Sequence, residues 1–327
     1  MFICGKVCLV KILITGVAGA IGSHLAERLL DLGHEVVGID SFRPYYSPEI
    51  KKINARDVES KGGKVYNLDL VKDDFDHLLH GVEVVFHLAA QPGISAATPF
   101  DVYLEDNIIA TQRLLDKVKL HSPLKAFVHA STSSVYGARA TGDETTEPKP
   151  TSYYGVTKLA AEQLALAQYR ESGMPVVVLR FFSVYGPRER PEKLYHKLIK
   201  SILEDKPMHL HEGSEHHVRS YTFIHDIVDG CVLVLENLDK AIGEIFNLGT
   251  DKTMTTGEGI KLIEKIMGKE AKFVHMPRRP GDQIETGANI SKMRKFFGYD
   301  PKMSLEEGLK RQVEWYKNKI HKGNEKN

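Results

Sequence analysis

The sequence predicts an α/β protein whose centre is a doubly wound parallel sheet. Over the first two-thirds of the chain, short runs rich in Val, Ile and Leu alternate with stretches of helical periodicity. Strands buried on both faces give such continuous apolar runs, and their alternation with helices is typical of βαβ units. The expected strands cover residues 11–15, 35–40, 65–70, 84–89, 126–130, 176–181 and 245–248. Helices are expected at residues 23–32, around Leu78, at 102–121 and at 153–172.

A glycine-rich loop follows the first expected strand. Gly16, Gly19 and Gly22 are spaced three apart, between that strand and the first helix. In this context the first glycine permits a tight turn, the second lets the backbone approach a pyrophosphate, and the third lets helix and strand pack closely. The N–H groups at the start of the helix then receive the phosphates. The loop therefore predicts a Rossmann-type dinucleotide site.

The second strand ends in Asp40, which is placed to accept both ribose hydroxyls and to repel a 2′-phosphate. This acid favours NAD over NADP, although the nearby Arg43 is the type of residue that holds a 2′-phosphate. Asp69, at the end of the third strand, suits the adenine edge. The full set expected around NAD is Gly16, Gly19, Ala20, Ile21, Gly22, Asp40, Asp69, Leu70, Leu88, Ala89, Ala90, Asn107, Tyr154, Lys158 and Phe181.

The pattern changes after Gly186 and Pro187. A helix at 194–204, a histidine-rich polar stretch, a helix beginning near Asp226 and mixed structure from residue 256 are expected there, with a last helix at 305–319. We therefore expect an NAD-binding domain and a smaller mixed α/β C-terminal domain for the substrate. The first comprises residues 11–182 with about 222–250, the second about 183–221 with 251–320, and residues 1–10 and 321–327 are extensions.

Composition excludes several other classes of function. Of the 327 residues 42% are apolar and 27% charged, as in soluble globular proteins, and no apolar run approaches the ~20 residues of a membrane span. A net charge of +1 gives no reason to expect nucleic acid or a membrane as partner. Three cysteines are too few for a disulfide framework, so a reducing cytoplasm is expected.

Tyr154 and Lys158 are four residues apart in an expected helix, so they share one helix face. A nearby ammonium favours the phenolate, which predicts that the pKa of Tyr154 falls from about 10 toward neutrality. A tyrosine tuned in this way can take a proton from a hydroxyl group and return it. Most pairs with this spacing are ordinary helix surfaces, so the weight of the pair depends on its context.

Several motifs give that context. They are the glycine loop, His87-Leu-Ala-Ala, Ser131-Thr-Ser-Ser-Val-Tyr-Gly, the Tyr-x-x-x-Lys pair, Arg180-Phe-Phe-Ser-Val-Tyr-Gly-Pro, Arg219-Ser-Tyr-Thr-Phe-Ile-His-Asp and Arg279-Pro-Gly-Asp. Together they resemble the extended short-chain dehydrogenase/reductase family, in its nucleotide-sugar epimerase/dehydratase branch. The resemblance runs from about Lys11 to Trp315.

The resemblance implies that bound NAD is reduced and reoxidised within each turnover, through a 4-keto sugar. It implies that Tyr154 is the acid/base at the sugar O4, that Lys158 binds the nicotinamide ribose, and that Thr132 hydrogen-bonds O4. The 4,6-dehydratases carry acids where this chain has Ser133 and Ser134, and the uronate decarboxylases carry an acid at the position of Ser134. The chain therefore looks like a 4-epimerase.

The segment from Asp40 to Lys51 is similar to that of UDP-glucuronate 4-epimerases. This similarity favours UDP-glucuronate and UDP-galacturonate, followed by UDP-glucose and UDP-galactose. The small Thr286 leaves N-acetyl forms open. A dehydratase, a 4-keto reductase and a non-catalytic nucleotide-sugar-binding protein are the alternatives.

The resemblance also assigns residues to the two halves of the substrate. Ser133, Ser134, Ser183 and Arg190 would hold the sugar carboxylate, and Arg219 and Arg279 the diphosphate. Tyr221 would line the uracil or ribose end. The full substrate-binding set is Ser133, Ser134, Ser183, Arg190, Arg219, Tyr221, Arg279 and Asp282.

Two further expectations concern partners and metals. In the family, helices matching residues 102–121 and 153–172 form a four-helix homodimer interface, although here both could instead be internal cover for the sheet. No metal is expected at His209, His211, His216 and His217, which lie in a polar stretch without an acidic ligand shell.

Overall fold

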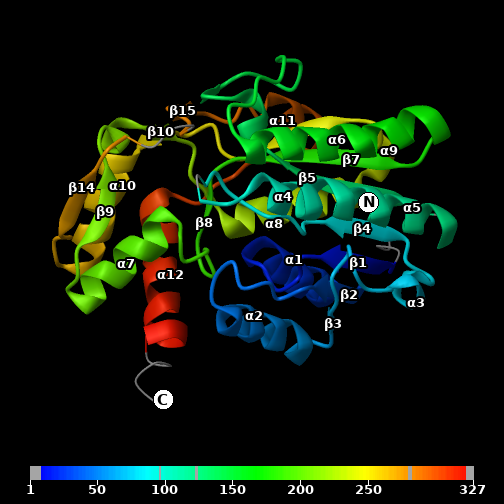
Figure 1. The fold of residues 1–327 in the computed structure, drawn as a ribbon, viewed down its shortest axis with the longest axis horizontal. Coiled ribbons are helices and arrows are strands. Elements are labelled where there is room, and N and C mark those ends of the chain that lie inside the picture. The colour runs from blue at the N-terminus through cyan, green and yellow to red at the C-terminus, as the bar shows by residue number, and fades with distance from the viewer. Residues whose placement is uncertain (1–8, 96, 122–123, 279–281, 322–327) are drawn as a thin grey trace, which may run out of the picture.

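The computed structural model describes residues 9–95, 97–121, 124–278 and 282–321. In these ranges seven parallel strands form the main sheet, in the order β12-β7-β5-β4-β1-β2-β3 (Figure 1). The strands are β1 (Lys11–Thr15), β2 (Glu35–Asp40), β3 (Lys64–Asn67), β4 (Val84–His87), β5 (Ala126–Thr132), β7 (Val176–Phe181) and β12 (Ile245–Leu248). The predicted fold class is confirmed.

Successive residues of each strand face opposite sides of the sheet, which explains the continuous apolar runs. Ile12 and Ile14 of β1 pack with helices α1 (Ala20–Asp31), α8 (Ile224–Glu236) and α11 (Ser291–Phe297). Leu13, between them, packs on the other face with α3 (Asp76–Leu79), α5 (Ala110–His121) and α6 (Tyr153–Ser172). Cys231 of α8 lies in the first of these two cores.

The order of the strands reverses beside β1, which pairs with β2 on one side and with β4 on the other. The chain leaves β1 toward β2 and β3, then crosses over β1 to β4 and β5. In open parallel sheets the ligand site lies outside the carboxyl ends of the strands at such a reversal. This topology places the glycine loop after β1 at the expected position of a site.

A smaller group of elements lies beside the sheet, at the left of Figure 1. Its core contains Ile199, Ile263 and Val313 from three different helices. The elements are α7 (Leu194–Glu204), β9 (Met208–His211), η3 (Ser214–His216), β10 (Val218–Arg219), β13 (Met254–Thr255), α10 (Thr256–Met267), β14 (Phe273–Met276), β15 (Glu285–Thr286), α12 (Leu305–Trp315) and η4 (Tyr316–His321). The remaining short elements are η2 (Ser133–Tyr136), β6 (Arg139–Ala140), β8 (Val184–Tyr185), β11 (Thr222–Phe223) and α9 (Leu238–Ala241).

Helix α2 (Pro48–Ser60) was not predicted from the sequence. This helix buries only Asn54, Ala55 and Val58, so it lacks the apolar periodicity by which a helix is predicted. Proline at its first position, preceded by Ser47, was the available signal.

The helix predicted over residues 102–121 is divided in the structure. It consists of α4 (Phe100–Tyr103), the π-helical turn η1 (Leu104–Ile109) and α5. Asn107 in the π turn is buried, and its side-chain amide bonds the backbone of Gln91 and the hydroxyl of Thr157. Turns of this kind that interrupt α-helices are frequently found at functional sites.

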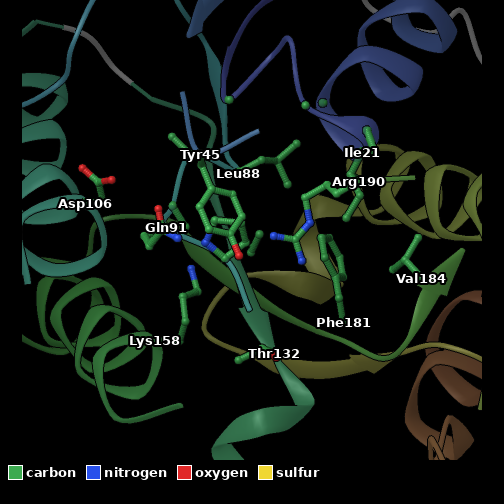
Figure 2. Close-up of a pocket in the computed structure, with 18 of the residues that line it drawn as sticks. Ile21, Tyr45, Leu88, Gln91, Asp106, Thr132, Lys158, Phe181, Val184 and Arg190 are labelled. Atoms are coloured by element: carbon green, nitrogen blue, oxygen red, sulfur yellow. The ribbon is translucent and has the colours of Figure 1, made fainter. Parts of the chain in front are cut away.

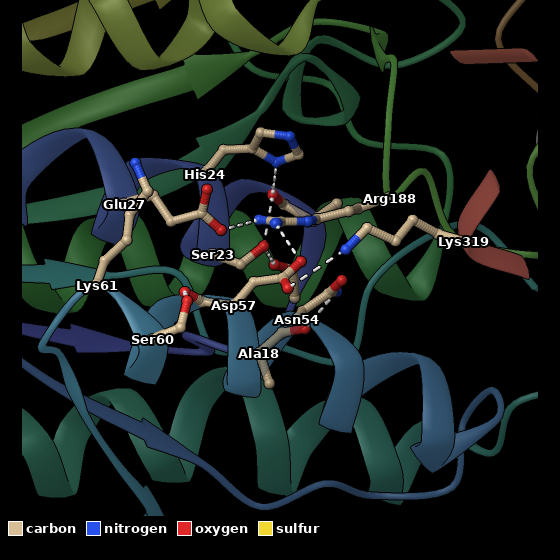
Figure 3. Close-up of polar contacts among 12 residues, drawn as sticks. Ala18, Ser23, His24, Glu27, Asn54, Asp57, Ser60, Lys61, Arg188 and Lys319 are labelled. Carbon is tan, nitrogen blue, oxygen red and sulfur yellow. Dashed lines mark hydrogen bonds and ion pairs between the residues drawn. The ribbon is translucent and has the colours of Figure 1, made fainter. Parts of the chain in front are cut away.

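Arg188 connects the main sheet region to the segment that follows β8 (Figure 3). Its buried guanidinium lies 2.6 Å from Glu27 of α1 and 2.8 Å from Asp57 of α2. Lys319 of η4 lies 3.7 Å from the same Asp57. Arg188 has a backbone φ of 64°, in the left-handed region that residues other than glycine rarely adopt. Arg188 therefore joins its loop to α1 and α2, and η4 adds a second cation at Asp57.

Two fully buried histidines lie in neighbouring strands of the sheet. His87 of β4 is hydrogen-bonded by both ring nitrogens, to Thr15 and to Thr111. His129 of β5 has no hydrogen-bond partner among the described residues. Burial, followed by the charge of Lys158, holds the pKa of His87 at about 3 and that of His129 well below 6.5. Both rings are therefore neutral in the folded protein at neutral pH.

Replacement of His129 by Phe is expected to make the stability less sensitive to acid. Below pH 6.5 the unfolded chain binds a proton at His129 that the folded chain does not, so the wild type loses stability as the pH falls. Between pH 7.5 and 5.5 this single site removes about 1.4 kcal/mol from the free energy of unfolding. Urea unfolding at both pH values measures the difference, and His216→Phe, at a side chain 83% exposed, is the matched control. The same acid dependence in His129→Phe and wild type would contradict the expectation.

Candidate active site

The glycine loop is shaped by close backbone contacts. A Cβ atom at Gly16 would lie 2.9 Å from the backbone nitrogen of Ala89, and one at Gly22 would lie 2.3 Å from the carbonyl oxygen of Gly16. Gly16 also has a φ of 72°. Helix α1 begins after Gly19 without a side-chain cap, so its first N–H groups remain available to a phosphate. The residues present fit a dinucleotide.

Acidic groups surround the position expected for the adenosine half. Asp40 is buried, and its carboxylate accepts hydrogen bonds from the backbone of Phe42 at 2.8 Å and of Ala18 at 3.2 Å. Arg43 lies 2.9 Å from Asp69 and 2.8 Å from Asp106. Burial raises the pKa of Asp106 to about 6, and Arg43 opposes this rise. Because Arg43 is held by these acids, it does not provide the counter-charge that a 2′-phosphate needs, and the arrangement favours NAD.

Tyr154, Lys158 and Thr132 come together where β5 meets α6. Thr132 ends β5 and caps the short helix η2 by accepting the N–H of Ser134 at 3.2 Å. The hydroxyl of Thr132 lies near enough to Tyr154 to lower the pKa of its phenol. A Cβ atom at Gly155 would lie 2.7 Å from the carbonyl oxygen of Ser134. The residue after Tyr154 therefore has to be small for α6 to approach the hydroxyl cluster, a signal that the sequence analysis did not use.

The predicted fall in the pKa of Tyr154 is wrong for the chain by itself. Burial raises this pKa, while the hydroxyl of Thr132 and the charge of Arg190 lower it less strongly. Lys158 is also buried, and burial lowers its pKa to about 8, against the opposing effect of Glu162. The predicted pKa of Tyr154 took account of the charge of Lys158 but not of the loss of hydration that burial causes at both groups.

A buried ion pair supports the base of the site. Glu162, one turn beyond Lys158 on α6, accepts two hydrogen bonds from Arg180 of β7, at 2.6 and 3.1 Å. Glu162 also accepts a hydrogen bond from Ser131 of β5 at 2.6 Å. Arg180 donates to the hydroxyl of Tyr136, which donates to Asn247 of β12, each at 2.8 Å. Glu162 and Arg180 are 0% and 2% exposed, so water cannot replace either partner.

Most of the predicted residues line one cleft of about 1810 Å³, counting the open space at its mouth (Figure 2). The part of this space that water-sized molecules can occupy is about 380 Å³, which lies within the ~300–1,000 Å³ of typical ligand pockets. The predicted residues that line it are Gly16, Gly19, Ala20, Ile21, Gly22, Asp40, Asp69, Leu70, Leu88, Ala89, Ala90, Thr132, Ser133, Ser134, Tyr154, Lys158, Phe181, Ser183 and Arg190.

Other predicted residues do not line this cleft. Asn107 lies behind it and holds Gln91, which does line it. Arg219 is bonded to the carbonyl oxygens of Val218 and Gln283. Tyr221 and Asp282 are also absent from the lining, and Arg279 lies outside the described residues. The roles proposed for these residues stay predictions.

The cleft also contains residues that the sequence analysis did not name as site residues. Gln283 donates to the carbonyl oxygen of Gly137 at 2.9 Å and so joins the smaller group of elements to η2. Lys193 lies 3.6 Å from Glu189, and burial lowers the pKa of the lysine. No motif marks them, because they reach the cleft only through tertiary folding. The unpredicted lining residues with polar side chains include Tyr45, Tyr46, Lys51, Gln91, Asp106, Glu189, Lys193 and Gln283.

Arg190 lies in the middle of the cleft view in Figure 2, between Tyr45 and Phe181. Its guanidinium carbon is 5.8 Å from the centre of the Tyr45 ring. The charge of Arg190 reaches Tyr154, whose pKa it lowers. A fixed cation therefore stands beside the hydroxyl groups of the site.

The described part of the chain contains neither a cluster of metal ligands nor a membrane-spanning helix. No three His, Cys, Asp or Glu side chains gather there as a metal ion would require. No helix in these ranges combines the length and the apolar character of a membrane span.

The sequence is similar to a known protein family and to several of its described members. The profile of the NAD dependent epimerase/dehydratase family matches residues 12–249. The chain belongs to this family. A Bacillus subtilis protein described as an uncharacterized UDP-glucose epimerase is 41% identical, covering 93% of this chain and 96% of its own length. UDP-glucuronate 4-epimerase 1 of Arabidopsis thaliana is 36% identical, over 94% of this chain and 76% of the relative.

Among solved structures, UDP-glucuronic acid 4-epimerase from Bacillus cereus, in complex with UDP-glucuronic acid and NAD, is 39% identical with a TM-score of 0.90. The similarity covers 94% of this chain and 99% of that one. The predicted family is therefore confirmed. The family match also confirms NAD as the cofactor and the assignment of the protein as an enzyme of the epimerase/dehydratase kind.

Replacement of Glu162 by Gln is expected to lower the free energy of unfolding by about 3 kcal/mol. The change leaves the buried Arg180 without its counter-charge, and removing one partner of a buried pair costs roughly 3–5 kcal/mol. Glu147→Gln is the control, because Glu147 is 77% exposed and pairs with Lys149 at the surface. Such surface pairs contribute about 0–1 kcal/mol. Urea unfolding measures both variants, and equal small losses would contradict a structural role for the buried pair.

Proposed function

We propose that this protein is a UDP-sugar 4-epimerase that interconverts UDP-glucuronate and UDP-galacturonate with bound NAD. One observation carries the proposal: Arg190 lies in the cleft with Tyr154 and the hydroxyls of Thr132, Ser133 and Ser134. A fixed cation suits a sugar carboxylate, and hydroxyls in place of acids suit oxidation and reduction without loss of water or CO2. The Bacillus cereus relative in complex with UDP-glucuronic acid supports the same substrate.

The residues of the glycine loop would hold the NAD pyrophosphate, and Asp40 the adenosine ribose. When bound, NAD supplies the hydride acceptor and donor for the sugar C4. Tyr154 would take the proton from O4 and return it, while Thr132 orients that oxygen by a hydrogen bond. Lys158 would bind the nicotinamide ribose. The raised pKa of Tyr154 suits the step in which the phenol gives its proton back.

The remaining substrate contacts are assigned on the same basis. Ser133, Ser134, Ser183 and Arg190 would hold the carboxylate. Arg219, Arg279, Tyr221 and Asp282 would hold the UDP half, and Gln283, bonded by Arg219, marks where that half enters the cleft.

We also propose the division of labour that the sequence predicts. Residues 11–182 with about 222–250 bind NAD, and about 183–221 with 251–320 bind the nucleotide sugar. A cytoplasmic homodimer is proposed through the region of α4 to α6. Exposed apolar side chains support this interface: Phe100, Ile109, Leu120, Tyr153 and Val156 are 39–79% exposed.

A second candidate substrate is UDP-glucose. The Bacillus subtilis relative favours it, and Ser183 and Arg190 are compatible with hydrogen bonds to a neutral sugar. The N-acetyl forms lose support, because Thr286 is fully buried in β15 and does not line the cleft.

The decisive test incubates the purified protein with UDP-glucuronate, UDP-glucose and UDP-N-acetylglucosamine without added cofactor. NMR identifies the products. Formation of UDP-galacturonate supports the proposal, whereas a deoxy or decarboxylated product overturns it. Turnover of UDP-glucose alone would assign the neutral sugar instead.

Replacement of Tyr154 by Phe is expected to lower kcat for epimerisation by about 10²- to 10⁴-fold, the usual contribution of an acid/base group. The NAD content of the purified protein should be unchanged, because the ring stays in place. Tyr153→Phe is the control on the same helix, since Tyr153 is 59% exposed and does not line the cleft. Unchanged turnover in Tyr154→Phe would refute the proton-transfer role.

Replacement of Arg190 by Met is expected to lower kcat/KM for UDP-glucuronate about 10- to 100-fold more than for UDP-glucose, because a charged hydrogen bond contributes about 1.5–3 kcal/mol. Initial rates with both substrates measure the ratio. Equal losses would remove the carboxylate assignment.

A further inference from the structure

Arg190 has a carboxylate partner within its own loop. Its Nη1 lies 2.8 Å from Oε1 of Glu192, two residues further along. The two side chains are 21% and 34% exposed, but both carboxylate oxygens of Glu192 and the Nη1 of Arg190 are themselves shielded from solvent. Within the described ranges, none of these three atoms makes a hydrogen bond of good geometry.

This contact is an ion pair with little else to support it. Two charges removed from water lose several kcal/mol of hydration each, and their attraction offsets that loss only when hydrogen bonds satisfy the remaining atoms. Glu162 and Arg180 meet this condition, since Glu162 accepts three hydrogen bonds. Among the described residues, Glu192 makes one ion pair, with Arg190, and its carboxylate accepts no hydrogen bond. Another carboxylate can therefore replace that of Glu192 at Arg190 with little loss of stabilising contacts.

The charge of Glu192 acts within the cleft. Burial is the main cause that raises the pKa of both Tyr45 and Tyr46; the charge of Glu192 adds to the rise at both, after that of Asp40 at Tyr46, and Arg190 lowers both. Both tyrosines line the cleft beside Arg190. A second acidic group, Glu189, lies near, but it is already bonded by the side chain of Gln312 and by the backbone of His196. Glu192 is the carboxylate that faces Arg190 directly.

We propose that Glu192 competes with the sugar carboxylate for Arg190 and so limits how strongly the cleft prefers acidic over neutral sugars. The inference rests on the proposed function, because it takes Arg190 as the uronate ligand. A uronate replaces one carboxylate by another, so Arg190 keeps a counter-charge throughout binding, while Glu192 turns toward solvent. A neutral hexose offers no such exchange, and Arg190 stays with Glu192.

The proposal predicts a gain on removing a charged side chain. In Glu192→Gln the competitor loses its charge but keeps its shape, so UDP-glucuronate should bind about 10-fold more tightly, which corresponds to ~1.4 kcal/mol. The dissociation constant of UDP-glucose should change less than about twofold. Isothermal titration on the NAD-loaded protein measures both ligands, and initial rates give KM and kcat. Glu306→Gln is the matched control, because Glu306 pairs with Lys265 and Lys310 on the surface of α12.

The opposite role for Glu192 gives the opposite result. If Glu192 held Arg190 in position for the substrate, Glu192→Gln would weaken UDP-glucuronate binding. Weaker or unchanged binding therefore overturns the proposal. Should Glu192→Gln fail to fold, Glu192→Asp withdraws the carboxylate by one methylene, and tighter uronate binding is again expected.

A double-variant cycle ties the effect to Arg190. In an Arg190→Met background the Glu192→Gln substitution should no longer change the affinity for UDP-glucuronate, because the shared partner is gone. If Glu192→Gln still tightens UDP-glucuronate binding in the Arg190→Met background, the effect comes from the loss of a negative charge near the ligand, and the proposed exchange at Arg190 is overturned.

Failure of the proposed function has a separate signature. A wild type that converts UDP-glucose but not UDP-glucuronate removes the proposed substrate. A wild type that epimerises UDP-glucuronate, with a Glu192→Gln variant that binds it no more tightly, removes only the role of Glu192.

Discussion

The buried contact between Glu162 and Arg180 is the interaction on which the site depends. It fastens α6, which carries Tyr154 and Lys158, to β7, and through Ser131 and Asn247 to β5 and β12. A charge pair without access to water is satisfied only in one arrangement, so it fixes the register between helix and sheet. The same carboxylate sustains the charge of Lys158 against the effect of burial. The side chain of Glu162 thus both fixes α6 to the sheet and raises the pKa of Lys158.

Charges in the cleft differ in how firmly they are held. Arg180 is locked by several hydrogen bonds, and Arg43 by carboxylates on either side. Within the described ranges, Arg190 forms an ion pair with one carboxylate, that of Glu192 on the same loop. Preorganised charges serve steps in which the protein must not move, whereas a loosely paired charge can accept a ligand. The part of the cleft around Tyr154 is therefore held by many hydrogen bonds, whereas the segment 186–193 holds its cation, Arg190, by fewer contacts.

The sequence predicted those parts of the protein that depend on local pattern. The strands, the glycine loop and α6 follow from residue periodicity and spacing, so they were found within a few residues. Helix α2 was missed because it packs few apolar residues, and the π turn at Asn107 because it depends on contacts with Gln91 and Thr157. The direction of the pKa shift of Tyr154 was wrong because burial cannot be read from two residues four apart. Glu192 and Gln283 join the site only through folding, and no motif marks them.

Arg188 places two demands on a single position of the chain. Its backbone, at a φ of 64°, would suit Gly, Asn or Asp. Its side chain must instead be a long cation that spans from Glu27 to Asp57. No residue meets both demands without strain, so substitutions here exchange one defect for another. Sequence variation at position 188, two residues before Arg190, is therefore restricted by a constraint that arises outside the cleft, and laboratory evolution that replaces Arg188 will have to change Glu27 and Asp57 as well.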